Sequence, residues 1–155
     1  MSEATPTTPR VRIRRVIDAP PADVFEAWTD PEGMRHWMRP GSITDAECEL
    51  DVREGGGFRI VMIAQEGDRL EHTGEYRVVD PPHKLVFTWI SGGTDGRESL
   101  VTVELFERGE RTELVLTHEK VPDERRAEMH TDGWTTIVDR LADQITRTPA
   151  DGSGG

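Results

Sequence analysis

The chain has 155 residues, a length that suits one domain with a substantial core. Its 19 basic and 30 acidic side chains give a formal net charge of −11. This excess of acidic residues argues against binding to nucleic acids or to anionic membrane surfaces, because both need basic residues to neutralise phosphates.

Both ends of the chain have compositions typical of flexible segments. We predict a disordered N-terminal segment over residues 1–9, a single domain over 10–147 and a disordered tail over 148–155. No apolar run approaches the roughly 18 residues of a membrane span, and the N-terminus has no apolar signal region. Cys48 is the only cysteine, so no internal disulfide can form. These features predict a protein without membrane insertion, in the reducing cytoplasm.

The first part of the chain predicts one strand and two short helices. Apolar residues within 11–17 fit a first strand. Pro20 and Pro21, followed by an acidic first turn, begin a short helix. Pro31 begins a second short helix, which we expect to end at about Trp37.

The middle of the chain predicts strands joined by turns. Six segments have alternating apolar residues and are bounded by Gly, Pro or Asp, the residues that favour turns. These segments are 43–51, 58–65, 70–79, 84–90, 99–106 and 112–119. The glycine-rich segment 91–96 is expected to be a loop. Because most connections are hairpins, we expect an antiparallel sheet with the helices gathered on one face.

The last predicted helix runs from about Asp123 to Ile145 and is amphipathic. Its apolar positions recur at spacings of three, four and one, so they share one face. They are Ala127, His130, Trp134, Ile137, Val138, Leu141 and Ile145. Gly133 lies in the helix interior, where glycine costs roughly 1 kcal/mol relative to alanine. A close approach of another segment to the helix backbone would explain this glycine.

Alternation along the strands predicts which side chains face this helix. We assign the alternating apolar sets to the concave side of the sheet. They are Phe58, Ile60, Met62, Tyr76, Val78, Leu85, Phe87, Trp89, Val101, Val103, Leu105, Leu114, Leu116 and His118.

Five segments in a fixed order resemble the activator-of-heat-shock-chaperone-ATPase-like (AHSA-type) family of the START-like, or SRPBCC, superfamily. The segments are APPADVFEAWTDPEGMRHWMRP, ECELDVREGGGFRIVM, GEYRVVDPPHKLVFTW, TVELFERGERTELVLTHE and DGWTTIVDRLADQI. The resemblance implies an α+β helix-grip fold. In this fold a seven-stranded curved antiparallel sheet and two short helices surround a long C-terminal helix, with a cavity between sheet and helix. It implies no single function, because related proteins include small-molecule binders, antibiotic-resistance proteins, aromatase/cyclases and a co-chaperone domain.

The leading hypothesis is non-enzymatic binding of a small, largely apolar molecule, aromatic or polyketide-like, in that cavity. We expect no cofactor, and no metal site because HExxH is absent and the histidines fall in separate elements. The expected ligand-binding residues are aromatic side chains, methionines and one histidine. They are Trp37, Phe58, Met62, Tyr76, Phe87, Trp89, His118, Met129 and Trp134. Tyr76 and His118 would orient the ligand through hydrogen bonds.

Several of these residues also have a purely structural interpretation. Trp37 could stack on a ligand at the cavity entrance, or it could anchor the two short helices. Trp89 and Trp134 could face each other across the cavity, or they could pack in the core. His118 could be a ligand donor, a general acid/base or a buried histidine with satisfied hydrogen bonds.

Two other functions remain open. An enzyme of the cyclase, dehydratase or hydrolase kind would use His118 or His130 as its acid/base. An interaction module that modulates a chaperone or another protein would instead expose an apolar patch. A homodimer through the sheet or its edge is compatible with either possibility.

Overall fold

One antiparallel sheet of seven strands organises the residues that this computed structural model describes, 10–41 and 43–147. The strands are β1 (Val11–Ile17), β2 (Ile43–Leu50), β3 (Gly57–Ala64), β4 (Arg69–Asp80), β5 (Lys84–Trp89), β6 (Ser99–Arg108) and β7 (Arg111–Glu119). The helices are α1 (Pro21–Thr29), α2 (Pro31–Met34), the 3-10 helix η1 (Gly92–Thr94) and α3 (Glu124–Arg147). The strand order is β1-β7-β6-β5-β4-β3-β2, with every neighbouring pair antiparallel. The predicted helix-grip fold is confirmed.

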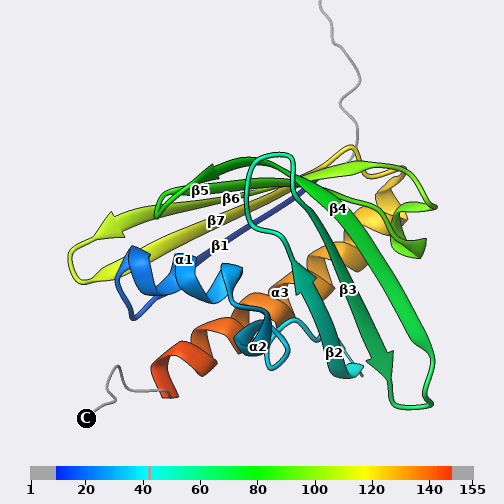
Figure 1. The fold of residues 1–155 in the computed structure, drawn as a ribbon, viewed down its shortest axis with the longest axis horizontal. Coiled ribbons are helices and arrows are strands. Elements are labelled where there is room, and N and C mark those ends of the chain that lie inside the picture. The colour runs from blue at the N-terminus through cyan, green and yellow to red at the C-terminus, as the bar shows by residue number, and fades with distance from the viewer. Residues whose placement is uncertain (1–9, 42, 148–155) are drawn as a thin grey trace, which may run out of the picture.

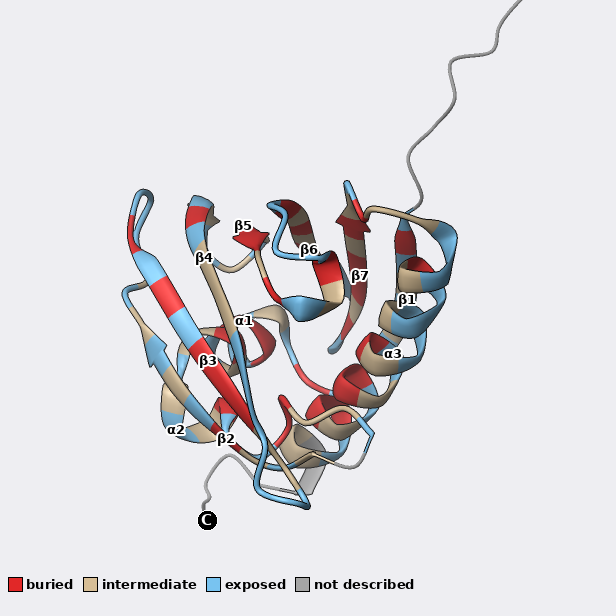
Figure 2. Ribbon diagram, turned by 90° about the vertical axis from the view of Figure 1, so that its right-hand side faces the viewer, coloured by how far each residue is buried: buried red, intermediate tan, exposed pale blue. Residues whose placement is uncertain are grey.

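The sheet curves around α3. Figure 1 shows the long helix crossing below the strands, with α1 and α2 at one end of the sheet. Figure 2 shows the sheet bending from β1, which lies beside α3, round to β3 and β2 on the other side. The helix α1 packs against β6, β7 and α3, whereas α2 packs against β2. The two terminal segments predicted to be disordered, 1–9 and 148–155, lie outside the described residues.

The predicted concave set makes up most of the core. Val101, Leu114 and Leu116 are fully buried, as expected for side chains on the inner face of a curved sheet. The apolar face of α3 packs onto them, with Val138 and Leu141 almost completely buried. The polar face of the helix lies on the outside.

The assignment of Val78 to the concave side is wrong. A register shift lies between Tyr76 and Val78 in the pairing of β4 with β5. Such an irregularity inserts a residue and reverses the alternation beyond it. Val79, rather than Val78, therefore packs against the core.

Two local predictions also differ from the structure. The helix α2 ends at Met34, and residues 35–37 form a turn in which the N–H of Met38 still bonds the Met34 carbonyl at 2.8 Å. The expected loop 91–96 contains η1. Its reciprocal cap joins the Ser91 hydroxyl to the Gly93 N–H and the Thr94 hydroxyl to the Ser91 N–H, each at 3.1 Å.

Candidate ligand-binding site

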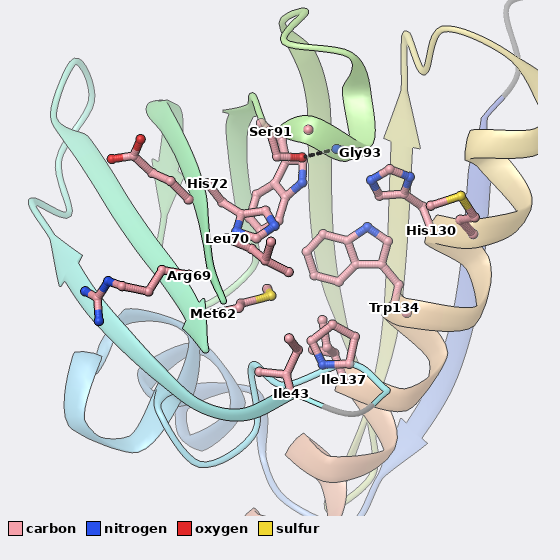
Figure 3. A pocket seen from close by; sticks show the side chains of 16 residues that line it. Ile43, Met62, Arg69, Leu70, His72, Ser91, Gly93, His130, Trp134 and Ile137 are labelled. Atoms are coloured by element: carbon pink, nitrogen blue, oxygen red, sulfur yellow. Dashed lines mark hydrogen bonds between the residues drawn. The ribbon is translucent and has the colours of Figure 1, made fainter. Parts of the chain in front are cut away.

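A pocket of about 490 Å³ lies between the N-terminal half of α3 and strands β3, β4 and β5. This volume is within the range of roughly 300–1,000 Å³ typical of small-molecule sites. The residues that line it come from the start of β2 and the segment before it, three further strands, η1 and α3 (Figure 3). They are Pro40, Ile43, Met62, Arg69, Leu70, Glu71, His72, Trp89, Ser91, Gly92, Gly93, Met129, His130, Gly133, Trp134 and Ile137.

Two tryptophans in mutual contact form the buried part of the pocket wall. The ring centroids of Trp89 and Trp134 are 5.1 Å apart, with 54° between the ring planes. Both side chains are almost completely buried. This separation leaves no room for a ligand between the rings, so the two tryptophans do not face each other across the cavity. A ligand would contact the pair from one side.

His118 holds this wall in place from behind. The Ser99 hydroxyl donates to the Trp89 carbonyl at 2.6 Å, so Ser99 Oγ accepts from His118 Nε2 at 2.7 Å. His118 Nδ1 then accepts from the Trp134 indole N–H at 3.0 Å. Burial, and secondarily the nearby His130, lowers the pKa of His118 to about 3. His118 is therefore a neutral imidazole with both nitrogens occupied, and it does not line the pocket.

Two other imidazoles do line the pocket. His130 lies on α3 one turn before Trp134, and His72 lies on β4 with its ring centroid 5.0 Å from that of Trp89. Burial lowers the pKa of His72 and of His130. Both are therefore uncharged at neutral pH.

The pocket opens between two exposed apolar side chains. Leu70 on β4 is 46% exposed and Met129 on α3 is 55% exposed, although both border the pocket. Each of these side chains therefore contacts both the pocket and the solvent. The mouth of the pocket therefore lies between β4 and α3.

The charged side chains that border the pocket are paired with partners on β2 and β3. Arg69 bonds Glu47 at 2.6 Å, and Glu71 bonds Arg59 at 2.5 Å. Figure 3 shows the Arg69 side chain directed away from the other pocket residues. The pocket interior therefore has no unpaired ionic group among the residues that the structure describes.

Four of the nine predicted ligand-binding residues line this pocket: Met62, Trp89, Met129 and Trp134. The other five, Trp37, Phe58, Tyr76, Phe87 and His118, are buried away from it. For these five residues, the structure favours the packing interpretation.

The aromatic residues away from the pocket fill the core. Trp37 packs edge-on against Trp28, with centroids 4.9 Å apart, as expected for an anchor of the short helices. Phe58 lies against Gly74, where a Cβ atom would come within 2.5 Å of its ring. The space beside Phe58, Tyr76 and Phe87 is about 10 Å³. That volume holds about one water molecule and no larger ligand.

Sequence reasoning missed most of the polar and small residues of the pocket. His72 and Leu70 belong to the polar start of β4, and Ser91, Gly92 and Gly93 belong to a segment expected to be a loop. Gly133 was the usable signal. Its nearest neighbour is Pro40, whose Cβ would lie 3.4 Å from a Cβ on Gly133. The close approach to the helix is therefore made by the segment between α2 and β2 and not by the sheet.

The described part of the chain contains no cluster of three or more His, Cys, Asp or Glu side chains able to hold a metal ion. None of its helices is long and apolar enough to span a bilayer.

The fold and the pocket define the protein as a helix-grip protein with an apolar pocket between its sheet and its long C-terminal helix. The family model described as activator of Hsp90 ATPase homolog 1-like protein matches residues 18–145. The chain belongs to this family, as the sequence resemblance implies.

Several solved structures share the fold. Protein CV1439 from Chromobacterium violaceum has a TM-score of 0.79 and 24% identity, covering 88% of this chain and 96% of that chain. CalU16 from Micromonospora echinospora has a TM-score of 0.68 and 29% identity, covering 88% and 76%. DynU16, from the dynemicin biosynthetic locus, has a TM-score of 0.73 and 25% identity, covering 89% and 47%. A comparison with curated proteins gives no match.

Proposed function

We propose that this protein binds a small, largely apolar aromatic or polyketide-like molecule in the pocket, without catalysing a reaction on it. The observation that carries the proposal is the pocket wall formed by Trp89 and Trp134, which faces a space of about 490 Å³. Aromatic and aliphatic walls with a few polar groups are typical of small-molecule sites. Met62, Leu70 and Ile137 extend the apolar surface that the ligand would cover.

The relatives agree with a small-molecule role. The superfamily that the sequence resembles includes small-molecule binders. DynU16, which is 25% identical to this chain, comes from a biosynthetic locus. The cytoplasm, expected from the sequence, remains our proposed compartment.

The hydrogen bonds of His118 weigh against the enzymatic alternative. Its two ring nitrogens bond Ser99 and Trp134, so neither is available to a substrate. His130 is the remaining candidate acid/base, and it lines the pocket. If the wild type converts a bound compound and His130→Phe does not, the protein is an enzyme and not only a binder.

The proposal is tested by measuring the binding of 2-methoxynaphthalene through tryptophan fluorescence. We expect Gly133→Met, which places a flexible apolar side chain in the pocket, to weaken binding about tenfold or more. Thr135→Met is the matched control, because Thr135 is exposed on the same helix and does not line the pocket.

Native mass spectrometry of protein purified from its own host would identify a retained molecule.

Two outcomes of the fluorescence measurement contradict the proposal. One is that neither 2-methoxynaphthalene nor 2-naphthol binds, and the other is that Gly133→Met and the wild type have equal affinities.

A further inference from the structure

We infer that the pocket selects uncharged aromatic molecules that carry hydroxyl groups, and that these groups donate hydrogen bonds to Nε2 of His72 and Nε2 of His130. The inference rests on the proposed function and specifies the class of ligand. It follows from which nitrogen of each imidazole carries a proton.

His130 has its proton on the nitrogen that faces its own helix. Nδ1 lies 2.7 Å from the backbone carbonyl oxygen of Arg126, and a carbonyl oxygen can only accept. Nδ1 is therefore the protonated nitrogen. Burial, with a smaller contribution from the Arg126 charge, lowers the pKa of His130, so the ring stays neutral at neutral pH. In a neutral ring with N–H at Nδ1, Nε2 is a hydrogen-bond acceptor.

His72 has the same arrangement on the opposite element. Its Nδ1 lies 3.3 Å from the carbonyl oxygen of Ile60, the residue paired with it on β3. Burial lowers the pKa of His72 as well. Nε2 of His72 is therefore a second acceptor, supplied by β4, whereas that of His130 is supplied by α3.

Among the described residues, His72 and His130 bond the Ile60 and Arg126 carbonyls through Nδ1, and the backbone of Leu70 also lies within hydrogen-bonding reach of the His72 ring. Both side chains line the pocket, and Figure 3 shows them approaching it from β4 and from α3. Gly93 keeps the space beside His130 open, because a Cβ on Gly93 would lie 3.1 Å from Nε2. The pocket thus presents two acceptors in an otherwise apolar wall.

A ligand must match these acceptors. A hydroxyl group supplies the donor that each Nε2 needs, whereas a methyl ether would bury an acceptor against an acceptor. A site that hydrogen-bonds a ligand's hydroxyl group strongly rejects analogues without that group. A purely apolar site discriminates less strongly between ligands that differ by a few atoms.

The charges around the pocket argue against an anionic ligand. Arg69, the cationic side chain that lines the pocket, already bonds Glu47 at 2.6 Å. A carboxylate in the pocket would lose its hydration and meet the lone pairs of two neutral imidazoles. A phenol would not carry this cost, because it is uncharged at neutral pH.

The test compares three naphthalenes of similar size by tryptophan fluorescence at pH 7.5: 2-naphthol, 2-methoxynaphthalene and 2-naphthoate. In the wild type we expect 2-naphthol to bind about tenfold more tightly than 2-methoxynaphthalene, and 2-naphthoate to bind most weakly. His72→Phe and His130→Phe keep an aromatic ring but remove the acceptor. Because 2-naphthol has one O–H group, it donates to one Nε2 at a time. At least one of the two variants should therefore reduce the preference for 2-naphthol severalfold while 2-methoxynaphthalene binds as well as before. His83→Phe is the matched control, because His83 is exposed outside the pocket.

A measurement on the unmodified protein accompanies the variants. The ¹⁵N resonance of the unprotonated Nε2 atom of His72 or of His130 should shift on addition of 2-naphthol, and neither resonance should shift on addition of 2-methoxynaphthalene. Equal affinity of the wild type for these two compounds, or a preference unchanged in both variants, overturns the inference and leaves the proposed function standing. Failure of all three compounds to bind overturns both.

Discussion

The concave side of the sheet contains two pairs of tryptophans in contact. Trp28 and Trp37 lie 4.9 Å apart in a packed region that also contains Phe58, Tyr76 and Phe87, whereas Trp89 and Trp134 lie 5.1 Å apart in the pocket region. The packed region leaves about 10 Å³ free, and the pocket region about 490 Å³. Similar aromatic pairs therefore do not decide where a ligand can enter.

The neighbours of each pair explain the difference. Met34 and Met38 are flexible side chains that fill the packed region beside Trp28. In the pocket region the corresponding neighbours include Gly93 and Gly133, which have no side chain to occupy the space. Small residues thus leave room that methionines would fill.

The two regions also differ in how their tryptophans are held. The indole N–H of Trp28 is buried without a hydrogen-bond partner among the described residues, and packing alone fixes its ring. The indole N–H of Trp134 bonds His118. Where neighbours do not enclose a ring on all sides, a hydrogen bond maintains its orientation.

The largest expected effect is that of Trp28→Ala in the packed region. Because the void cannot be filled by relaxation alone, we expect the free energy of unfolding to fall by about 3–5 kcal/mol. Urea denaturation monitored by circular dichroism measures this change. A loss below about 1 kcal/mol would show that the packed region is not closely packed.

Removal of the His118 ring tests the support of the pocket wall. His118→Leu leaves the buried Trp134 N–H without its acceptor and removes the donor to Ser99 Oγ, so we expect a loss of about 2–3 kcal/mol in stability. The affinity for 2-methoxynaphthalene should also fall as Trp134 loses its fixed orientation. His118→Gln, which retains a donor and an acceptor, should restore part of both. A variant that binds as the wild type does would assign His118 to packing alone.

The low pKa of His118 predicts a loss of stability in acid. The folded value is about 3 and the ordinary value is 6.5, so the unfolded chain takes up the proton first as the pH falls below about 6.5. The free energy of unfolding should then decrease by up to about 1.4 kcal/mol per pH unit between about pH 6 and pH 3, and this group should contribute no slope above pH 7.5.

Denaturation of wild type and His118→Leu at pH 7 and pH 5 isolates this contribution. The wild type should lose about 1–2 kcal/mol more than the variant between these two pH values. His83→Gln, which changes an exposed histidine, should follow the wild type. Parallel losses in wild type and His118→Leu would be inconsistent with a buried neutral imidazole.

The smallest expected effect is that of Met129→Ala at the mouth of the pocket. Its side chain is 55% exposed, so stability should change by less than about 0.5 kcal/mol. The affinity for 2-methoxynaphthalene should fall about threefold, because the rim loses apolar contact area. Val16→Ala on β1 is the control, since Val16 is 50% exposed and does not line the pocket. Equal affinities in the two variants would remove Met129 from the site.

The fold was predictable because its signals are local. Alternation in the strands and the three-four spacing of Trp134, Ile137, Val138 and Leu141 depend only on residues within one element. The errors occurred where a local irregularity replaced the regular pattern, as at the bulge before Val78.

The site was predictable only in part. The aromatic residues were recognised as facing the interior, yet alternation cannot distinguish Phe87, which packs against Trp28, from Trp89, which borders the pocket. His72 was missed because it lies among polar residues at the start of β4. Its contact with Trp89 depends on the pairing of two strands and not on its own segment.

The sequence by itself determined the elements, their order and the apolar face of α3, because periodicity and turn residues act over a few neighbouring positions. Only the tertiary structure decided which part of that face is covered and which borders an open pocket. Pro40 and η1 approach α3 closely, and the pocket is the space that remains between the helix, β3, β4 and β5, so it depends on contacts between segments distant in the chain. Contacts between separate elements also fix the proton positions of His72 and His118, whereas the Arg126 carbonyl in the same helix fixes that of His130.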